Sequence, residues 1–307
     1  MVKTHQDGLL LLDKPAGMTS HDVVIRARRA LQTKKIGHCG TLDPDAVGLL
    51  VLTVGLATRL TRFLIRAPKV YEGTIRFGVV TDTYDASGQV VSEHPTADLN
   101  EAAIKRAMEG FLGAQLQSPP PYCAKKVGGV KYYELARRGE QVPDEKKEIV
   151  VYRFEILGGY EPGHDLRFVL SCASGTYARS LAHDLGQTLG CGGILSSLCR
   201  TQIGSLKLGD AIGLEALQQR MAAQEELGPA FISFDEIPLP FGEVITDVQQ
   251  ERRIHHGQSV LVRDLECREG DWIKLINHRR ELIAVGAVIE RIGTGNVGVV
   301  QPKVVFR

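Results

Sequence analysis

The sequence predicts an α+β protein in two parts, a large domain of residues 1–240 and a small β domain of residues 241–307. In the first part, residues 71–79 alternate apolar and polar side chains, the period of a strand buried on one face, while residues 99–112 show helical periodicity. Beyond residue 260, short β-type runs separated by Gly, Asn and charged turns indicate a small barrel or sandwich. A chain of 307 residues is long enough for both parts.

The first elements are a buried strand and an amphipathic helix. Four leucines, residues 9–12, end in the turn at residues 13–17, which contains Pro and Gly. Thr19 or Ser20 then caps a helix that reaches about Thr33, with its apolar residues on the inner face.

A stiff loop then leads into a second buried strand. Gly37 and Gly40 permit tight turns, and Pro44 pushes Asp43 into an extended conformation. The apolar run of residues 49–54 has the length of a strand. A carboxylate thus stands beside the core on a rigid loop, which suits a catalytic group, although Asp-Pro is also an ordinary way to open a turn.

Residues 57–65 are compatible with a helix, on which Arg59, Arg62 and Arg66 share one face because they are three and four residues apart. We interpret this face as a phosphate-binding ridge. Tyr71 begins the alternating strand, and the pattern alone makes it a core aromatic.

Two polar segments follow the helix of residues 99–112. Residues 118–126 contain three prolines and form a stiff basic loop. Residues 128–138 interleave aromatic and basic side chains, including Tyr132, as RNA-contacting surfaces do. Tyrosines packed beneath a surface loop would give the same pattern.

Two further strands, at residues 149–157 and 165–172, precede a helix that Ser174 or Thr176 can cap. Arg179 falls in the first turn of this helix, where a cation opposes the helix dipole. Another group must therefore require an arginine at this position.

Composition and charge exclude several classes of protein. The hydrophobic fraction of 43% and the charged fraction of 24% are those of a globular protein, and no apolar run approaches the roughly 20 residues that span a bilayer. Without a secretory signal, we expect a cytoplasmic protein. Six widely spread cysteines contain no Cys-x-x-Cys pair, which argues against zinc knuckles and disulfides. The net charge of +1 averages a basic region at residues 14–69 and an acidic one at residues 208–248, so a local positive face can still attract RNA.

Residues 37–50 read Gly-His-x-Gly-Thr-Leu-Asp-Pro-x-Ala-x-Gly-x-Leu and closely resemble the catalytic-aspartate motif of the TruB family of tRNA pseudouridine synthases. Further matching segments occur in the family's order, at residues 13–24, 69–71, 81–88 and 174–181. Together they span most of residues 9 to 200. The position and length of the C-terminal region resemble, more loosely, the PUA-like RNA-binding module of these enzymes.

The resemblance implies a pseudouridine synthase core with a mixed, largely antiparallel sheet flanked by helices and loops, followed by a PUA-like β-barrel. It implies that Asp43 is the catalytic aspartate, that Arg179 pairs with it and that Tyr71 packs on the target base. Whether Asp43 attacks the sugar, attacks the base at C6 or removes a sugar proton stays open.

Four more residues match positions that the resemblance associates with substrate binding: Lys14, His38, Asp85 and Tyr177. His38 resembles the family histidine that helps to fill the space left by a flipped base. Lys14 lies in the first motif, which supports the catalytic loop in the family, so an architectural role is also predicted for it.

The implied reaction converts uridine 55 in the T-loop of tRNA to pseudouridine after base flipping. This isomerisation demands no redox step, external energy or metal, and the sequence has no phosphate loop, dinucleotide fingerprint or metal-ligand spacing. We therefore expect no cofactor and no metal, a monomer, no membrane, and the tRNA T-arm as partner. A non-catalytic RNA-binding or tRNA-folding protein is the alternative, and a hydrolase that uses His38 and Asp43 is a third possibility.

Overall fold

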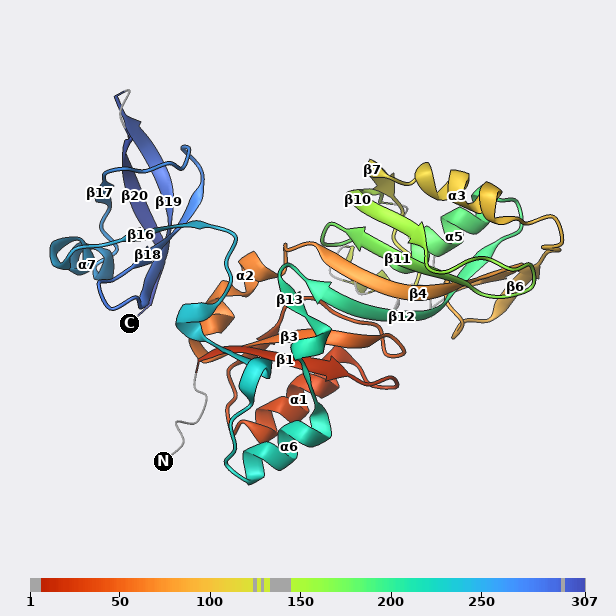
Figure 1. Ribbon diagram of the computed structural model, residues 1–307, viewed down its shortest axis with the longest axis horizontal. Helices are drawn as coiled ribbons and strands as arrows, with labels where there is room; N and C mark the ends of the chain where they lie inside the picture. Colours follow the sequence, from red (N-terminus) through yellow and green to blue (C-terminus); the bar gives the residue numbers. More distant parts are fainter. Residues whose placement is uncertain (1–6, 124–125, 128–129, 133–144, 294–295, 307) are drawn as a thin grey trace.

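The computed structural model describes residues 7–123, 126–127, 130–132, 145–293 and 296–306 (Figure 1). Within these residues, eleven strands form one mixed sheet and five strands form a second, C-terminal sheet. The predicted α+β class is confirmed. None of the described helices is both long enough and apolar enough to cross a membrane.

The large sheet is mixed and largely antiparallel, as predicted, because only β1 with β14 and β3 with β12 pair in parallel among its described strands. Three short strands pair alongside the main path: β2 (Ile36–His38) with β3, β13 (Leu206–Lys207) with β12, and β15 (Phe231–Ser233) with β1. The main path runs in the order β14 (Ile212–Gly213), β1 (Gly8–Lys14), β3 (Val47–Val54), β12 (Gly193–Ile203), β4 (Lys69–Phe77), β11 (Leu166–Cys172), β10 (Lys147–Ile156) and β7 (Gly113–Gln117).

β1 is buried on both faces, which explains its four consecutive leucines. Leu9 and Leu11 pack into a core shared with the C-terminal sheet, whereas Leu10 and Leu12 pack into a core beneath two helices. Side chains alternate along a strand, so a run without polar residues satisfies both cores at once.

Helices cover the large sheet in two places (Figure 1). α1 (Ser20–Ala30) and α6 (Leu214–Ala222) pack together beside β1, while α3 (Glu101–Glu109) and α5 (Ala178–Thr188) pack on the other half of the sheet, where β4, β10 and β11 lie. Thr19 is the N-cap of α1 in a capping box with Asp22. This cap fixes the start of α1 and leaves the side chain of Ser20 free for another contact.

Several predicted boundaries differ from the structure. The helix expected up to Thr33 ends at Ala30, and the helix expected over residues 57–65 is a 3-10 helix, η1 (Gly55–Leu60), followed by α2 (Thr61–Leu64). The prediction that Ser174 or Thr176 caps α5 is wrong. Tyr177 is the N-cap without a side-chain bond, because Thr176 Oγ1 donates instead to the carbonyl of Ala173 at 3.0 Å.

The C-terminal sheet contains the four predicted β-type runs. They are β17 (Val260–Val262), β18 (Trp272–Ile276), β19 (Leu282–Ile292) and β20 (Val297–Val305). The sequence interpretation missed β16 (Gly242–Ile245) and the polar helix α7 (Val248–His255), which complete this part of the chain. It encloses a core of its own and is consistent with a PUA-like domain. The connection to it holds η2 (Leu208–Asp210), η3 (Gly228–Ala230) and η4 (Phe234–Glu236).

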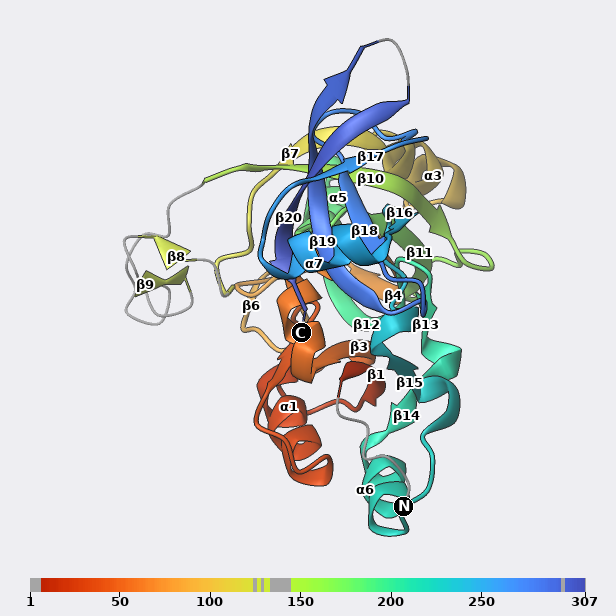
Figure 2. The same ribbon diagram turned by 90° about the vertical axis from the view of Figure 1, so that its left-hand side faces the viewer.

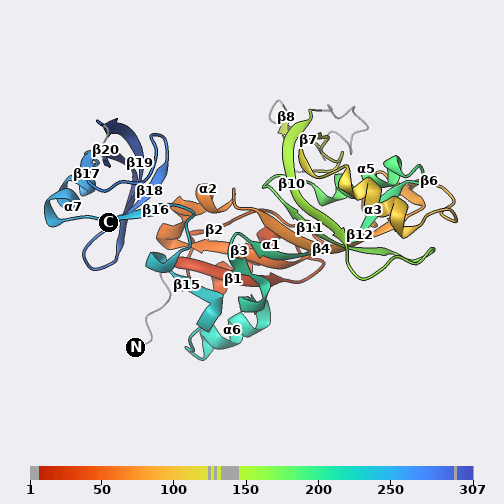
Figure 3. The ribbon, with the colours of Figure 1, turned by 45° about the horizontal axis from the view of Figure 1, so that its top comes forward.

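The segment that contains α2 lies between the large sheet and the C-terminal sheet (Figures 1 and 3), and aromatic side chains make contact there. The ring centroid of Phe63 lies 5.1 Å from that of Phe241 and 4.8 Å from that of Trp272. The guanidinium of Arg62 lies 5.3 Å from the Trp272 centroid, and that of Arg59 lies at the same distance from Phe306. Two of the three arginines interpreted as a phosphate ridge therefore contact the C-terminal part of the chain.

The remaining described strands form two hairpins. β5 (Val79–Thr81) pairs with β6 (Val90–Glu93), and β8 (Lys126–Val127) pairs with β9 (Val130–Lys131), which Figure 2 shows standing apart from the large sheet. Most of the interleaved basic and aromatic segment lies outside the described residues. Tyr132 is described and fully buried, so at this position the packing alternative holds.

Candidate active site

The loop between β2 and β3 carries Asp43, and Lys14 holds this loop from β1. The Lys14 side chain is fully buried, and its ammonium donates to the carbonyls of Pro15, Pro44 and Ala46 at 3.0, 2.8 and 2.6 Å. Burial lowers the pKa of Lys14, and nearby aspartates oppose that shift. All three ammonium hydrogens are committed to backbone, so the predicted substrate contact of Lys14 is corrected to a positioning role.

A second clamp comes from Arg200 in β12. This guanidinium is 1% exposed, and it donates to the carbonyls of Leu49, Gly40 and Thr41 at 2.8, 3.0 and 3.4 Å. Gly40 has a φ of +124°, which favours glycine, and this conformation lets its carbonyl face the arginine. Arg200 was not among the residues that sequence reasoning singled out.

A third clamp comes from α1. Ser20 Oγ accepts a hydrogen bond from the backbone N–H of Leu42 at 2.9 Å and lies 3.1 Å from the Leu42 carbonyl, to which it donates. Both backbone polar groups of Leu42, the residue before Asp43, are therefore hydrogen-bonded to Ser20. The loop is held by three elements, which fixes the place of the Asp43 side chain.

The Asp43 carboxylate forms a two-point ion pair with one arginine. Arg179 Nε lies 3.0 Å from Oδ2, and Nη2 lies 3.2 Å from Oδ1, so the pair is bidentate. The remaining donors of Arg179 reach the carbonyls of Thr83 and Tyr122 at 3.2 and 3.1 Å and Asp85 Oδ2 at 3.4 Å. Arg179 thus makes three hydrogen bonds and faces two carboxylates, which accounts for an arginine in the first turn of α5.

Asp85 lies in the turn between β5 and β6. Its Oδ1 accepts from Thr83 Oγ1 at 2.7 Å and from the backbone N–H and Oγ of Ser87 at 3.1 and 2.6 Å. Hydrogen bonds from Ala86 N to the Leu195 carbonyl, at 3.1 Å, and from Leu195 N back to this turn attach it to β12. The turn therefore presents the second oxygen of Asp85 to Arg179 from a fixed position.

Two cavities lie on the two sides of the Asp43–Arg179 pair. The larger, of about 410 Å³, is bordered by Asp85 and Tyr122, and the smaller, of about 260 Å³, is bordered by Tyr71. Both cavities include Asp43 and Arg179 in their walls. Because 46% of the Asp43 side chain is exposed whereas only 8% of Arg179 is, the carboxylate is open to a ligand and its partner is not.

Tyr71 and Tyr177 both line the smaller cavity. Tyr71 lies in β4 and is 8% exposed, and burial raises the pKa of its hydroxyl. Tyr177 is held by Gln117, which accepts from its backbone N–H at 2.8 Å and donates to its carbonyl at 3.0 Å. Burial also raises the pKa of Tyr177. Two neutral aromatic side chains therefore border the space beside Asp43.

His38 ends β2 beside the catalytic loop and lines neither cavity among the described residues. Burial, and after it the charge of Arg200, lowers the pKa of His38. The predicted role of His38 in filling the space of a flipped base therefore stays a prediction.

Lys69 is the first residue of β4 and lines the smaller cavity with Arg200. Its side chain is 4% exposed, and its ammonium donates to the carbonyls of Ile65 and Ala67, each at 2.8 Å. Burial, followed by the charge of Arg200, lowers the pKa of Lys69 to about 8. Sequence reasoning noted Lys69 only as part of a motif. For Arg200, the available signal was a lone cation among the apolar residues of a strand.

Within the part of the chain that the structure describes, no three His, Cys, Asp or Glu side chains are grouped as metal ligands would be. The six cysteines are free, and burial raises the pKa of Cys39 to about 12 and that of Cys172 to about 11. The thiols of Cys39 and Cys172 are thus neutral at physiological pH.

Two protein families match the chain. The family described as TruB family pseudouridylate synthase (N terminal domain) matches residues 28–178, and the one described as tRNA pseudouridylate synthase B C-terminal domain matches residues 179–240. The tRNA pseudouridine synthase B of Opitutus terrae is 50% identical over 212 residues, covering 69% of this chain and 87% of the relative. That of Solibacter usitatus is 39% identical over 284 residues, covering 92% of this chain and 96% of the relative.

Solved structures with a similar fold cover nearly the whole chain. The H/ACA RNP bound to a substrate RNA containing 2′-deoxyuridine has a TM-score of 0.76 at 25% identity, covering 99% of this chain and 86% of that chain. The archaeal box H/ACA sRNP Nop10–Cbf5 complex has a TM-score of 0.74 at 25% identity, with coverages of 99% and 87%.

Proposed function

Because this chain belongs to the TruB family of tRNA pseudouridine synthases, we propose that Asp43 performs the isomerisation of uridine 55 in the T-loop to pseudouridine. The observation that carries this proposal is the bidentate pair of Asp43 and Arg179 between two cavities. A non-catalytic RNA-binding or tRNA-folding protein is not favoured, since both relatives are named as synthases and the match covers 87% and 96% of their length.

The reaction needs a carboxylate at a fixed place. The two-point ion pair with Arg179 orients Asp43, and the contacts of Lys14, Ser20 and Arg200 hold the loop in place. The exposed part of the carboxylate can then meet the sugar or the base of a bound uridine. This arrangement is compatible with each of the three roles left open for Asp43.

The detached base needs a surface on which to turn. Tyr71 offers an aromatic face in the wall of the smaller cavity, beside Asp43 and Tyr177. We propose that the uracil ring packs on Tyr71 while it is separated from the sugar. A base can enter this cavity only after it has left its stack, and flipping costs a few kcal/mol that contacts elsewhere on the RNA must offset.

Three further residues near Asp43 are placed where they could contact the substrate. We propose that Asp85 and Tyr177 contact substrate from the walls of the larger and the smaller cavity, and that His38 contacts the RNA next to the loop. The enzyme would act in the cytoplasm, as a monomer, on the T-arm of its tRNA.

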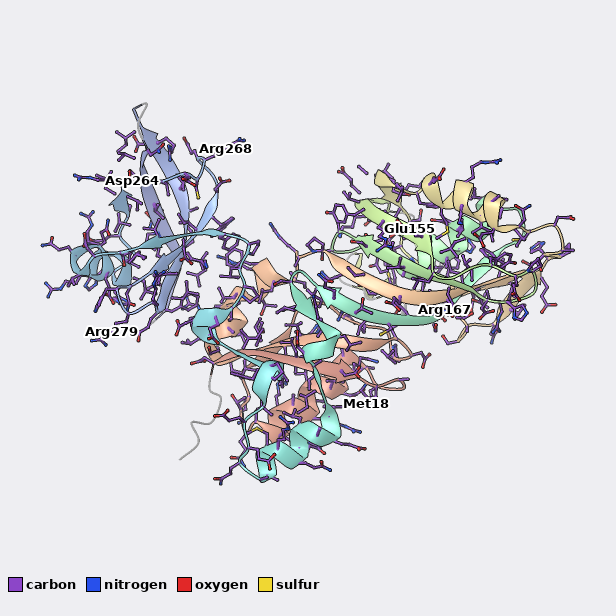
Figure 4. The ribbon with its side chains drawn as sticks, viewed as in Figure 1. Met18, Glu155, Arg167, Asp264, Arg268 and Arg279 are labelled. Carbon is purple, nitrogen blue, oxygen red and sulfur yellow. The ribbon has the colours of Figure 1, made fainter. Side chains whose placement is uncertain are left out.

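We propose residues 1–240 as the catalytic domain and residues 241–307 as a PUA-like RNA-binding domain. The second of the two family matches ends at residue 240, and the C-terminal sheet begins with β16 at Gly242. Arg268 and Arg279 project outward from this sheet in different directions (Figure 4). Exposed arginines of this kind can supply phosphate contacts that are sensitive to salt.

The test is to incubate the protein with an unmodified T-arm stem-loop and measure pseudouridine. We expect complete conversion without an added cofactor. Tight binding without product would support the non-catalytic alternative, and free uracil or cleaved RNA would support a hydrolase that uses His38 and Asp43.

A further inference from the structure

The smaller cavity carries a surplus of buried positive charge. Lys69 and Arg200 line it, and neither has a carboxylate within ion-pair distance among the described residues. Both side chains are held by backbone carbonyls instead. Arg179 differs from them, because Asp43 and Asp85 both pair with it.

Burying a charge without a counter-ion is costly, and two like charges that share one site make it more so. The charge of Arg200 is indeed a cause of the lowered pKa of Lys69. The loop clamp accounts for Arg200, but it does not account for an ammonium at residue 69. Lys69 contacts the end of α2 and has no hydrogen bond to the catalytic loop in the described part of the chain.

The Lys69 ammonium makes two hydrogen bonds among the described residues, one fewer than its number of N–H groups. An ammonium has three hydrogens, and two of those of Lys69 go to Ile65 and Ala67. Ile65 and Lys69 both border the smaller cavity, in which Tyr71 and Asp43 also lie. A third N–H is therefore available to a ligand that brings a negative charge into this cavity.

The proposed reaction creates such a charge. When Asp43 attacks C1′ or removes a sugar proton, the C1′–N1 bond breaks and its electron pair stays on N1 of the ring. The detached uracil is then an anion whose charge is spread over N1, O2 and O4. After the ring turns, C5 bonds to C1′ as the bond from C1′ to Asp43 breaks, or as C2′ regains the proton that Asp43 removed. The C5 proton is then lost to solvent and N1 gains a proton, so atoms and electrons balance.

We propose that Lys69, supported by Arg200, is a catalytic residue that stabilises the negative charge of the uracil ring as the C1′–N1 bond breaks. This inference rests on the proposed function. It assigns the cations of the smaller cavity to the leaving group, whereas Arg179 serves the carboxylate. A phosphate of the RNA backbone could use the same donor, and the experiment distinguishes the two sources.

The experiment compares Lys69→Met with the wild type in single-turnover reactions on a T-arm that carries uridine or 5-fluorouridine at the target position. With 5-fluorouridine the assay follows consumption of the starting nucleoside, since fluorine blocks loss of a C5 proton. Fluorine withdraws electrons and makes uracil a better leaving group. We expect a loss of about a hundredfold on uridine, as when one charge-stabilising donor is removed, and a clearly smaller loss on 5-fluorouridine.

Lys14→Met is the matched control, because Lys14 is equally buried and holds only the loop. Its losses on the two substrates should be equal. The ratio of the two rates does not depend on how much of a variant is folded, so a poorly folding variant still gives an answer. Lys69→Arg should recover part of the rate on uridine.

Two results would overturn the inference. Equal losses on both substrates for Lys69→Met would show a purely structural lysine. A weaker, less salt-dependent RNA affinity with an unchanged single-turnover rate would assign Lys69 to a backbone phosphate. Failure of the proposed function looks different, because the wild type itself would then form no pseudouridine.

Discussion

The two cavities beside Asp43 share one wall and differ in charge. On the side of the larger cavity, Arg179 faces two carboxylates and makes three hydrogen bonds. On the side of the smaller cavity, Lys69 and Arg200 are buried and donate to backbone carbonyls, with no carboxylate within ion-pair distance among the described residues. We call the side of the larger cavity balanced, because its cation is paired with carboxylates that hold it in place. We call the side of the smaller cavity unbalanced, because its unpaired cations can stabilise a negative charge that appears during a reaction.

A substitution at Asp43, which lies in the wall shared by both cavities, should have the largest effect on turnover. We expect Asp43→Asn to lower turnover by about 10⁴-fold or more, the scale for removing a group that acts on the reacting atoms. RNA affinity should stay within a few-fold, because phosphate contacts remain. The measurement is pseudouridine formation in single turnover together with RNA binding, and turnover near the wild-type rate would refute the assignment of Asp43.

On the balanced side, Arg179→Lys tests whether geometry matters beyond charge. Lysine keeps the charge but cannot make two parallel hydrogen bonds to Asp43, and it leaves the carbonyls of Thr83 and Tyr122 without a donor. We expect a loss of about 10²-fold to 10³-fold in kcat, comparable to that for a removed charge-stabilising donor. A variant that retains most of its kcat would mean that orientation of Asp43 is not limiting.

In the smaller cavity, the pH dependence of the single-turnover rate should report the protonation of Lys69. The groups around Lys69 are Arg200, Cys39, Cys172 and, through Arg200, Tyr71. The thiols and the phenol have raised pKa values and stay neutral, so Lys69, with a pKa of about 8, is the group that titrates. Its charged form exists below that pKa. The single-turnover rate should therefore fall as the pH rises through about 8, and Lys69→Arg should flatten this decline.

Asp85→Asn is a milder way to disturb the balanced side. The asparagine oxygen can still accept from Thr83 and Ser87, but one of the two negative charges facing Arg179 is lost. A partly exposed ion pair contributes up to about 1 kcal/mol, so we expect at most a fivefold change in kcat. A loss as large as that for Arg179→Lys would show that Asp85 contributes more than a second ion pair.

The smallest effect should come from a region outside both cavities. Arg62→Ala removes a cation from the rings of Phe63 and Trp272 and should reduce the free energy of unfolding by about 0.5–1 kcal/mol. Activity on the T-arm should not change. Thermal unfolding against Arg29→Ala, an exposed arginine of α1, is the matched comparison. Equal shifts in the two variants would argue against a stabilising role for the contact between the sheets.

Strong periodic patterns made most of the fold predictable. The four C-terminal β-type runs and the buried strand of leucines appear where the sequence indicated them. The helix α7 was missed because its residues are mostly polar, although Asp247 and Gln250 form a capping box that the sequence already contained. The cap of α5 was wrongly assigned, because Thr176 bonds backward to Ala173 rather than forward into the helix.

The sequence by itself determined the family, the strained loop around Asp43 and the pairing partner to expect for it. These features are local, since a motif of fourteen consecutive residues contains the glycines, the proline and the carboxylate that shape the loop. The tertiary structure alone decided which backbone carbonyls Lys14 holds and that Lys69 and Arg200 share a cavity. Arg200 and Gly40 are separated by 160 residues, and their contact depends on β12 lying beside β3 and β4. Whether a cation meets a carboxylate or only carbonyls is settled by such long-range packing, which no local pattern encodes.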